Sequence, residues 1–269
     1  MIRHDDGFVL VIVLWTLALV ALIATEIVAI GRSETRQAAN LRAAAQAEAA
    51  ADGAIYEAVF RLTDGSPSHW NADSITRTVA LAGAMVQIRI ENDAGKINPN
   101  LVSVALMQTL MLNLGVPALQ AQSISTAILD WRSPGNFPHP GGAKAPQYLA
   151  AGLRYGPPGA PLESLDELGA VLGMTSPVLD RLRPYLSIYV TGEPDPRFAA
   201  PPVAAALSEV GDTADETLGE GFQNPVSLVS ITANAAIGGA RFTRRATVRI
   251  DPAYPGRPYR VLTWAAPPG

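Results

Sequence analysis

One short stretch of the sequence places two groups of opposite charge where acid–base chemistry can be imagined. Asp93 and Lys96 stand three residues apart in NDAGKINPN, and such a pair can in principle donate and accept a proton. The surrounding residues favour a structural loop instead, because Asp and Asn cap backbone amides and Gly95 permits a left-handed turn. We therefore interpret the stretch as a turn and not as a catalytic site.

The rest of the chain offers little support for catalysis or for metal binding through thiols or imidazoles. The sequence contains no G-x-S-x-G, no H-E-x-x-H and no phosphate-binding loop, and it has no cysteine. Its three histidines, His4, His69 and His139, lie far apart. We predict that the protein is not an enzyme.

A second stretch, LDELGAVLGMTSPVLDRL, has the character of a helix–hairpin–helix, a motif that can bind the DNA backbone. Only Gly173 stands at the turn, and Glu163, Asp166 and Glu167 surround it. Acidic side chains repel phosphate, and the net charge of the 269-residue chain is −4. We therefore expect a structural helix pair and no nucleic-acid partner.

The elements that position these stretches begin with one long helix. An apolar run, FVLVIVLWTLALVALIAT, occupies residues 8–25, and helix formers without proline continue to about Leu62. Such a helix is a rod of about 80 Å. Ile55, Val59 and Leu62 fall on one face, with Leu41 and Ala45 further toward the N-terminus, so this face is expected to pack on a globular head.

The remaining sequence reads as strands, then helices, then strands. Residues 75–97 alternate in part and predict two strands with a turn at Ala82–Gly83. Residues 98–190 predict helices: one from Leu101 capped by Asn98–Asn100, then QAQSISTAILDWR, a mostly loop segment, SLDELGAVLG, and SPVLDRLRPYLSIY with Ser176 as N-cap. Residues 191–221 are rich in Pro, Ala and Gly and predict a loose linker, and residues 222–266 predict the last strands.

This order predicts an α+β fold. A long N-terminal helix packs on an antiparallel sheet, and an all-helical domain is inserted between the strands.

The N-terminus resembles the class III leader of type IV pilins and type II secretion pseudopilins. MIRHDDG followed by Phe8 implies a leader of residues 1–7, cleavage between Gly7 and Phe8 by the prepilin peptidase, and N-methylation of Phe8. Residues 8–25 would then be a transmembrane and fibre-core helix, and residues 26–63 its periplasmic part. Relatives usually carry Lys or Arg before the glycine, whereas this chain has Asp6.

The fifth residue after the implied cut is Ile12, where most pilins and pseudopilins have glutamate. A carboxylate in an apolar bundle needs a charged partner. A subunit with no neighbour ahead of it lacks that partner, so an apolar residue there indicates a tip subunit. A simple membrane anchor would not need the glutamate either, and position five alone does not separate the two.

The chain resembles the K-type minor pseudopilins of type II secretion over nearly its whole length. The resemblance rests on VLVIVLW, NDAGKINPN, ILDWR, and LESLDELGAVLGMT followed by LRPYL. It implies a tip subunit that starts or caps the pseudopilus for export across the outer membrane. It also implies a single pass through the bacterial inner membrane, with the head in the periplasm.

The implied partners are the I-type and J-type minor pseudopilins, then the H-type and the major pseudopilin. Three alternatives remain at this point: a plain signal anchor with a stalk, a minor pilin of a type IV pilus, and a membrane-anchored periplasmic enzyme.

The resemblance also implies a calcium site, because relatives carry several acidic residues after the Asp-Trp pair and again in a Gly-Ala-Glu-Asp-like stretch. Here the first place reads DWRSPGN, so we expect Asp130 to remain as a hydrogen bonder at a helix C-terminus and Asn136 as a turn residue, while GAKA replaces the second stretch. Arg132 and Lys144 bring positive charge to the region. Calcium needs six to eight oxygen ligands, so we expect this site to be lost or weak, with no other cofactor.

Overall fold

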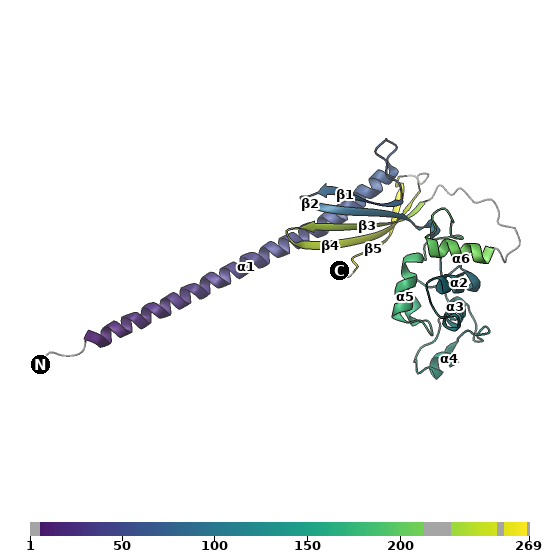
Figure 1. Cartoon of the computed structure of the whole chain (residues 1–269), viewed down its shortest axis with the longest axis horizontal. Coiled ribbons are helices and arrows are strands. Elements are labelled where there is room, and N and C mark those ends of the chain that lie inside the picture. Colours follow the sequence, from purple (N-terminus) through teal and green to yellow (C-terminus); the bar gives the residue numbers. More distant parts are fainter. Residues whose placement is uncertain (1–5, 212–226, 252–255, 268–269) are drawn as a thin grey trace.

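The computed structural model describes residues 6–211, 227–251 and 256–267, and within α1 it describes no side chains for residues 6–9, 25–33 and 35. Helix α1 (Asp6–Thr63) is by far the longest element. Figure 1 shows it running out from a sheet, with the shorter helices gathered beside the other end of that sheet. The expected mixed class of helix and antiparallel sheet is confirmed.

Helix α1 is continuous because its 58 residues contain no proline and are rich in alanine. At a rise of about 1.5 Å per residue its length is about 87 Å. Over the described part of the chain, no helix combines the length and apolarity needed to cross a membrane.

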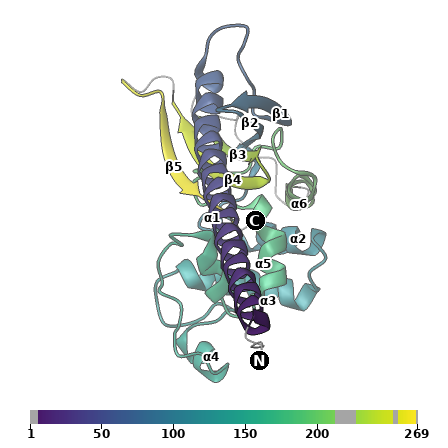
Figure 2. The same cartoon turned by 90° about the vertical axis from the view of Figure 1, so that its left-hand side faces the viewer.

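The C-terminal part of α1 packs on the sheet through small side chains. Ala47, Ala51, Ala54, Ile55 and Val59 are almost completely buried there, and Figure 2 shows the sheet behind this part of the helix. Alanine lets the helix axis approach the strands closely, and the packed face is correspondingly narrow.

The expectation for the N-terminal extension of this face was wrong. Leu41 and Ala45 are exposed, because they precede the first buried contact at Ala47.

The sheet has five antiparallel strands in sequence order. They are β1 (Asp73–Leu81), β2 (Ala84–Asn92), β3 (Ser227–Ile237), β4 (Ala240–Ile250) and β5 (Tyr259–Ala265). The predicted strands and the turn at Ala82–Gly83, where both residues have positive φ, are confirmed. Alternate residues of β2 are buried against α1, which explains the alternating sequence pattern.

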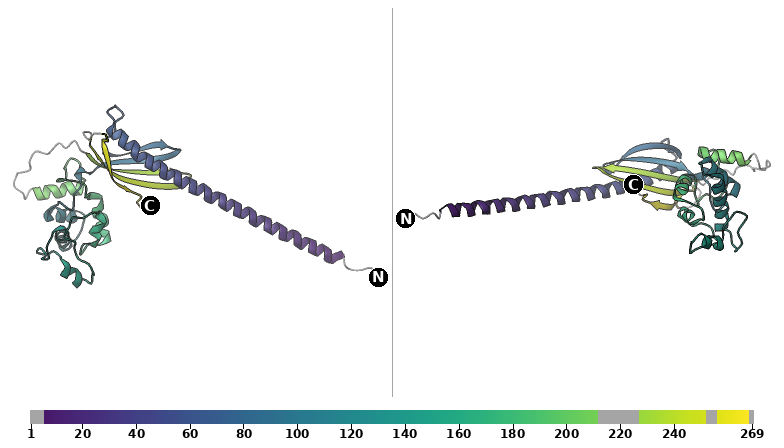
Figure 3. Two further views of the ribbon diagram at one scale, coloured as in Figure 1. Left: turned by 180° about the vertical axis from the view of Figure 1, so that it is seen from behind. Right: turned by 60° about the horizontal axis from the view of Figure 1, so that its bottom comes forward.

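The helices lie between β2 and β3 in the chain, yet β2 and β3 are hydrogen-bonded neighbours. Their register runs from Met85 opposite Ala236 to Asn92 opposite Val229. The chain therefore leaves the sheet at the end of β2, builds a separate helical body, and returns to the adjacent position. Figure 3 shows this body beside one end of the strands, away from the free end of α1.

The helical body has its own hydrophobic core. Its elements are η1 (Asp93–Gly95), α2 (Val104–Asn113), α3 (Ala118–Arg132), α4 (Ala145–Ala150), η2 (Leu165–Ala170), α5 (Ser176–Leu182), η3 (Arg183–Tyr185) and α6 (Pro201–Gly211). Met107, Leu110, Ile124, Tyr148 and Leu182 are at most 1% exposed within it. Because this cluster and the cluster between α1 and the sheet share no buried residue, the two bodies have separate cores.

Two predicted helix starts were wrong. Helix α2 begins at Val104, because Ser103 caps it by accepting a hydrogen bond from the Leu106 amide. Asn98 instead donates to the main-chain oxygen of Val190, 2.6 Å away. Helix α5 has Thr175, not Ser176, as its N-cap.

Three further expectations for the helical region need correction. The segment SLDELGAVLG forms the short 3-10 helix η2 and not an α-helix, and the mostly loop segment contains α4. The expected linker 191–221 contains α6, because Val203 and Ala206 are buried against the helical core. Residues 212–221 of that linker lie outside the described residues.

Candidate functional site

The residues expected to govern processing lie at the start of α1. The helix begins at Asp6, so Gly7 and Phe8 belong to its first turn, while residues 1–5 of the expected leader lie outside the described residues. Ile12 is 47% exposed. The apolar side chains around it are at least as exposed to solvent. They are Leu10, Val11, Val13, Leu14, Trp15, Leu17, Leu19, Val20, Leu22 and Ile23.

This exposure has a physical consequence. A helix that is apolar on every side is stable only when lipid or other protein covers it. Residues 10–23 of α1 therefore form an exposed apolar rod, whereas the last turns of the helix are already covered by the sheet.

Arg244 connects the sheet to helix α1. Arg244 on β4 donates from Nε to Asp52 Oδ1 at 2.5 Å and from Nη2 to Glu48 Oε1 at 2.9 Å, so it reaches two successive turns of α1. The hydrogen bond with Asp52 raises the pKa of Arg244. The guanidinium also lies over the Phe242 and Trp264 rings, at 4.8 and 5.4 Å from their centroids.

Asp93 and Lys96 meet where the sheet joins the helical body. Lys96 Nζ lies 2.6 Å from Asp93 Oδ1, and Ser230 on β3 donates to Asp93 Oδ2 at 2.8 Å. Burial raises the pKa of Asp93, and this outweighs the opposing effect of the Lys96 charge. Because Asp93 is 1% exposed and both of its oxygens face protein groups, this geometry braces the junction and presents no open acid or base.

The role predicted for Gly95 was wrong. Its φ is not among the positive values in the described residues, and Asn92 caps the turn by accepting from the Ala94 amide. Glycine is required because the backbone of Phe198 and Ala199 passes against it, and an added Cβ would overlap those atoms. This contact with a segment a hundred residues away leaves no signal in the local sequence.

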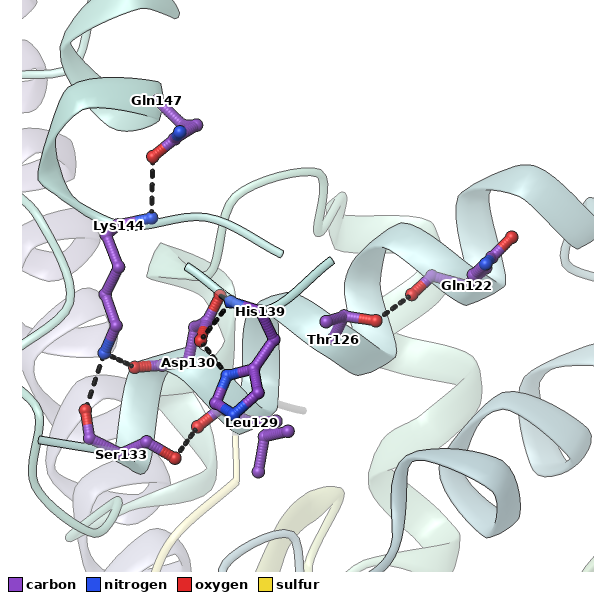
Figure 4. Close-up of polar contacts among 8 residues, drawn as sticks. All are labelled: Gln122, Thr126, Leu129, Asp130, Ser133, His139, Lys144 and Gln147. Carbon is purple, nitrogen blue, oxygen red and sulfur yellow. Dashed lines mark hydrogen bonds and ion pairs between the residues drawn. The ribbon is translucent and has the colours of Figure 1, made fainter. Parts of the chain in front are cut away.

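A second polar cluster surrounds Asp130 at the end of α3 (Figure 4). The Asp130 carboxylate is completely buried and accepts from the main-chain nitrogen of His139 at 3.2 and 3.3 Å, and its Oδ1 lies 2.6 Å from His139 Nδ1. Gly142 packs against Oδ2, where a Cβ would not fit. His139 was not predicted as a member of this cluster, because its spacing from Asp130 matches no ligand pattern.

Lys144 completes this cluster from the other side. Its side chain is buried, and Nζ donates to the main-chain oxygens of Asp130 and Ser133, each at 2.6 Å. Its main-chain nitrogen donates to Gln147 Oε1 at the start of α4. Lys144 therefore ties the end of α3 to the start of α4, as Figure 4 shows.

The other two residues predicted for the calcium region lie apart from this cluster. Arg132 turns to the segment before α2, where its Nη atoms donate to the main-chain oxygens of Pro99 and Val102 at 2.8 and 2.6 Å, and burial lowers its pKa. The expectation that Arg132 adds charge to the cation region was wrong in this respect. Asn136 is exposed in the connecting loop.

These residues do not fit a calcium ion. One carboxylate is present, and it is already engaged by His139, while the neighbouring carbonyl oxygens bind an ammonium group. Within the described ranges, no three acidic or histidine side chains are grouped so as to hold a metal. The predicted loss of calcium binding stays a prediction until it is measured.

Comparisons with known proteins agree on one family. Residues 80–191 match the family model described as "Type II secretion system (T2SS), protein K". An 81-residue stretch is 31% identical to the type II secretion system protein K of Pectobacterium carotovorum subsp. carotovorum. That stretch is 30% of this chain and spans about a quarter (25%) of the relative's length.

The fold has a counterpart among solved structures. A chain in the crystal structure of the GspK–GspI–GspJ complex from the type 2 secretion system of enterotoxigenic Escherichia coli superposes with a TM-score of 0.62. The match covers 88% of this chain and 100% of that chain, at 15% sequence identity. This likeness agrees with the mixed fold of helices and an antiparallel sheet.

Proposed function

We propose that this chain, a member of the type II secretion protein K family, works as the minor pseudopilin at the tip of the pseudopilus, where it starts or caps assembly for protein export across the outer membrane. One observation carries the proposal. A helical body emerges between the neighbouring strands β2 and β3 of a sheet that is packed on a long N-terminal helix.

The position of the helical body favours a tip over a place within the fibre. The sheet and the last turns of α1 make the pseudopilin head, and the helical body from η1 to α6 is the domain inserted into it. A subunit inside a helical fibre must repeat at close spacing, and a second body beside the sheet obstructs that repeat. At the tip no further subunit has to be accommodated above it.

The first turns of α1 are the proposed anchor. Their open apolar side chains suit the hydrocarbon of the bacterial inner membrane before assembly and a bundle of neighbouring rods afterwards. The head then lies in the periplasm. Removal of residues 1–7 by the prepilin peptidase and methylation of Phe8 complete the maturation that the leader sequence favours.

Ile12 supports the tip position. A glutamate at this place would carry a charge in an apolar bundle, at a cost of several kcal/mol when unpaired. A tip subunit has no amine of a preceding subunit to pair with, so isoleucine is the less costly residue.

The proposed partners follow from the same arrangement. The matched solved structure is a complex with GspI and GspJ, and we assign the I-type and J-type minor pseudopilins as the direct partners of this chain. The H-type and the major pseudopilin would extend the fibre below them. The protein would have no catalytic role.

Mass spectrometry of the N-terminus tests the maturation step. Protein extracted from the membrane of cells that contain the prepilin peptidase is expected to begin with methylated Phe8. The Gly7→Val variant is expected to keep the leader, with its N-terminus at or next to Met1, because the peptidase needs the glycine.

The matched control is Asp6→Lys, which restores the basic residue usual in relatives and should be processed at least as completely as the parent. A mature N-terminus at any other residue, or processing of Gly7→Val equal to the parent, would contradict the proposed leader.

A further inference from the structure

The buried ammonium group of Lys144 lies at the C-terminal end of α3. Lys144 is 3% exposed, and its ammonium lies 2.6 Å from each of two main-chain oxygens, those of Asp130 and Ser133. These oxygens belong to the last turn of α3 and to its C-cap. Helix C-termini present unsatisfied carbonyls and partial negative charge, so a cation is favoured at this point.

The oxygens around Nζ are of a kind that calcium can also bind. Calcium takes six to eight oxygen ligands, main-chain carbonyls among them, and two such carbonyls here accept short hydrogen bonds from the Lys144 ammonium. A divalent ion and the ammonium group would therefore compete for these two oxygens.

The same lysine organises the loop that follows. Residues 133–144 leave α3 and return to it, and the Asp130 carboxylate holds the middle of this loop at His139. Lys144 closes the end, and its own main-chain nitrogen is fixed by Gln147 of α4. The loop is thus ordered by one buried carboxylate and one buried ammonium, which lie on opposite sides of the helix end (Figure 4).

We propose that the Lys144 ammonium is a built-in cation that takes the place of a divalent metal, so that the α3–α4 connection is ordered without any metal ion. The inference stands on the geometry of Lys144 and does not depend on the proposed function.

Thermal unfolding of the purified full-length chain tests the proposal with calcium chloride and with EGTA. The parent should melt at the same temperature in both. Lys144→Met removes the ammonium group and keeps the unbranched apolar stem of the side chain, so its Tm should fall by several degrees in both conditions. Lys144→Glu adds a carboxylate beside the same carbonyls, so its Tm should be low in EGTA and should rise again in calcium.

The outcomes separate clearly. A parent Tm that rises with calcium, or a Lys144→Met variant as stable as the parent, would overturn the proposal. A Lys144→Glu variant that calcium does not stabilise would also overturn it, because the oxygens around Nζ would then not form a cation position.

The composition of the chain provides an independent readout. Its only lysines are Lys96 and Lys144, so amine acetylation followed by peptide mass spectrometry reports on each separately. Lys96, whose side chain is 18% exposed, is the internal reference. The folded parent should be acetylated at Lys96 several-fold faster than at Lys144, and denaturant should remove the difference. Equal rates in the folded protein would show that Lys144 is not held and would overturn the proposal.

Discussion

Gly95 must lack a side chain because the segment before α6 packs directly against η1. The backbone of Phe198 and Ala199 lies where its Cβ would be, and the main-chain nitrogen of Asp195 donates to the Ala94 oxygen at 2.8 Å. Gly95→Ala is therefore expected to lower the free energy of unfolding by about 2 kcal/mol or more, since backbone atoms must move apart. Urea denaturation followed by circular dichroism measures the change.

Gly53 is the matched control, because no atom lies within 4 Å of the position of its Cβ in α1. Gly53→Ala should raise the free energy of unfolding by about 0.5–1 kcal/mol through helix propensity alone. Equal effects of the two substitutions would show that segment 195–199 does not pack on the turn as described.

Asp93 makes a pH-dependent contribution to stability. Burial raises its pKa in the folded state, so the protonated form favours folding. This contribution is fully present below the unfolded pKa of about 3.9 and is lost as pH rises through the folded pKa. The stability of the parent relative to Asp93→Asn is therefore expected to decrease as pH rises above about 4, as measured by urea denaturation at each pH.

Asp73 provides a control of opposite sign. Its hydrogen bond with Arg77 lowers its pKa, so its contribution is present above the unfolded pKa and is lost as pH falls through the folded value. The stability of the parent relative to Asp73→Asn should increase as pH rises toward the unfolded pKa of about 3.9 and stay level above it, and the change should be small because the pair is partly exposed. The same trend for both variants would disprove the assignment for Asp93.

At the scale of elements, the contact between α1 and the sheet depends on alanine. Ala54 is completely buried against the strands, so Ala54→Leu is expected to push the helix from the sheet and to cost about 1–3 kcal/mol. Ala49 lies on the exposed side of the same helix, and Ala49→Leu should change stability by less than about 0.5 kcal/mol. Denaturant titration of both variants compares them, and a destabilised Ala49→Leu with an unaffected Ala54→Leu would reverse the assigned faces.

The strands could be predicted from sequence because their signals are local. Val86, Ile88 and Ile90 alternate with polar residues, and Ala82–Gly83 marks a tight turn. Helix starts were less predictable, because several residues in the same stretch are good caps. Ser103 caps α2, whereas the Asn98 side chain donates a hydrogen bond to the main-chain oxygen of the distant Val190.

The candidate sites could be predicted only in part for the same reason. Asp130 and Lys144 were visible as charged residues in one region, but their pairing with His139 and with two carbonyl oxygens arises from the path of the loop. Arg132 shows the limit of sequence proximity. It lies two residues from Asp130, yet its guanidinium binds the segment before α2.

At the scale of the whole molecule, α1 connects two environments. Its last turns are covered by the sheet through the buried alanines and the Arg244 contacts, while residues 10–23 expose apolar side chains on all sides. The helical body stands apart from both contacts. A molecule of this form has one covered end and one end that requires partners, which is the form expected of a subunit that begins an assembly.

The most direct test of the central proposal is co-purification from membranes of cells that also contain the I-type and J-type minor pseudopilins of the same secretion system. Affinity capture of this chain, followed by native mass spectrometry, is expected to yield a complex with one copy of each of the three proteins. In this complex the captured chain should begin at Phe8. Recovery of this chain alone, under conditions in which the I-type and J-type proteins still pair with each other, would contradict the account.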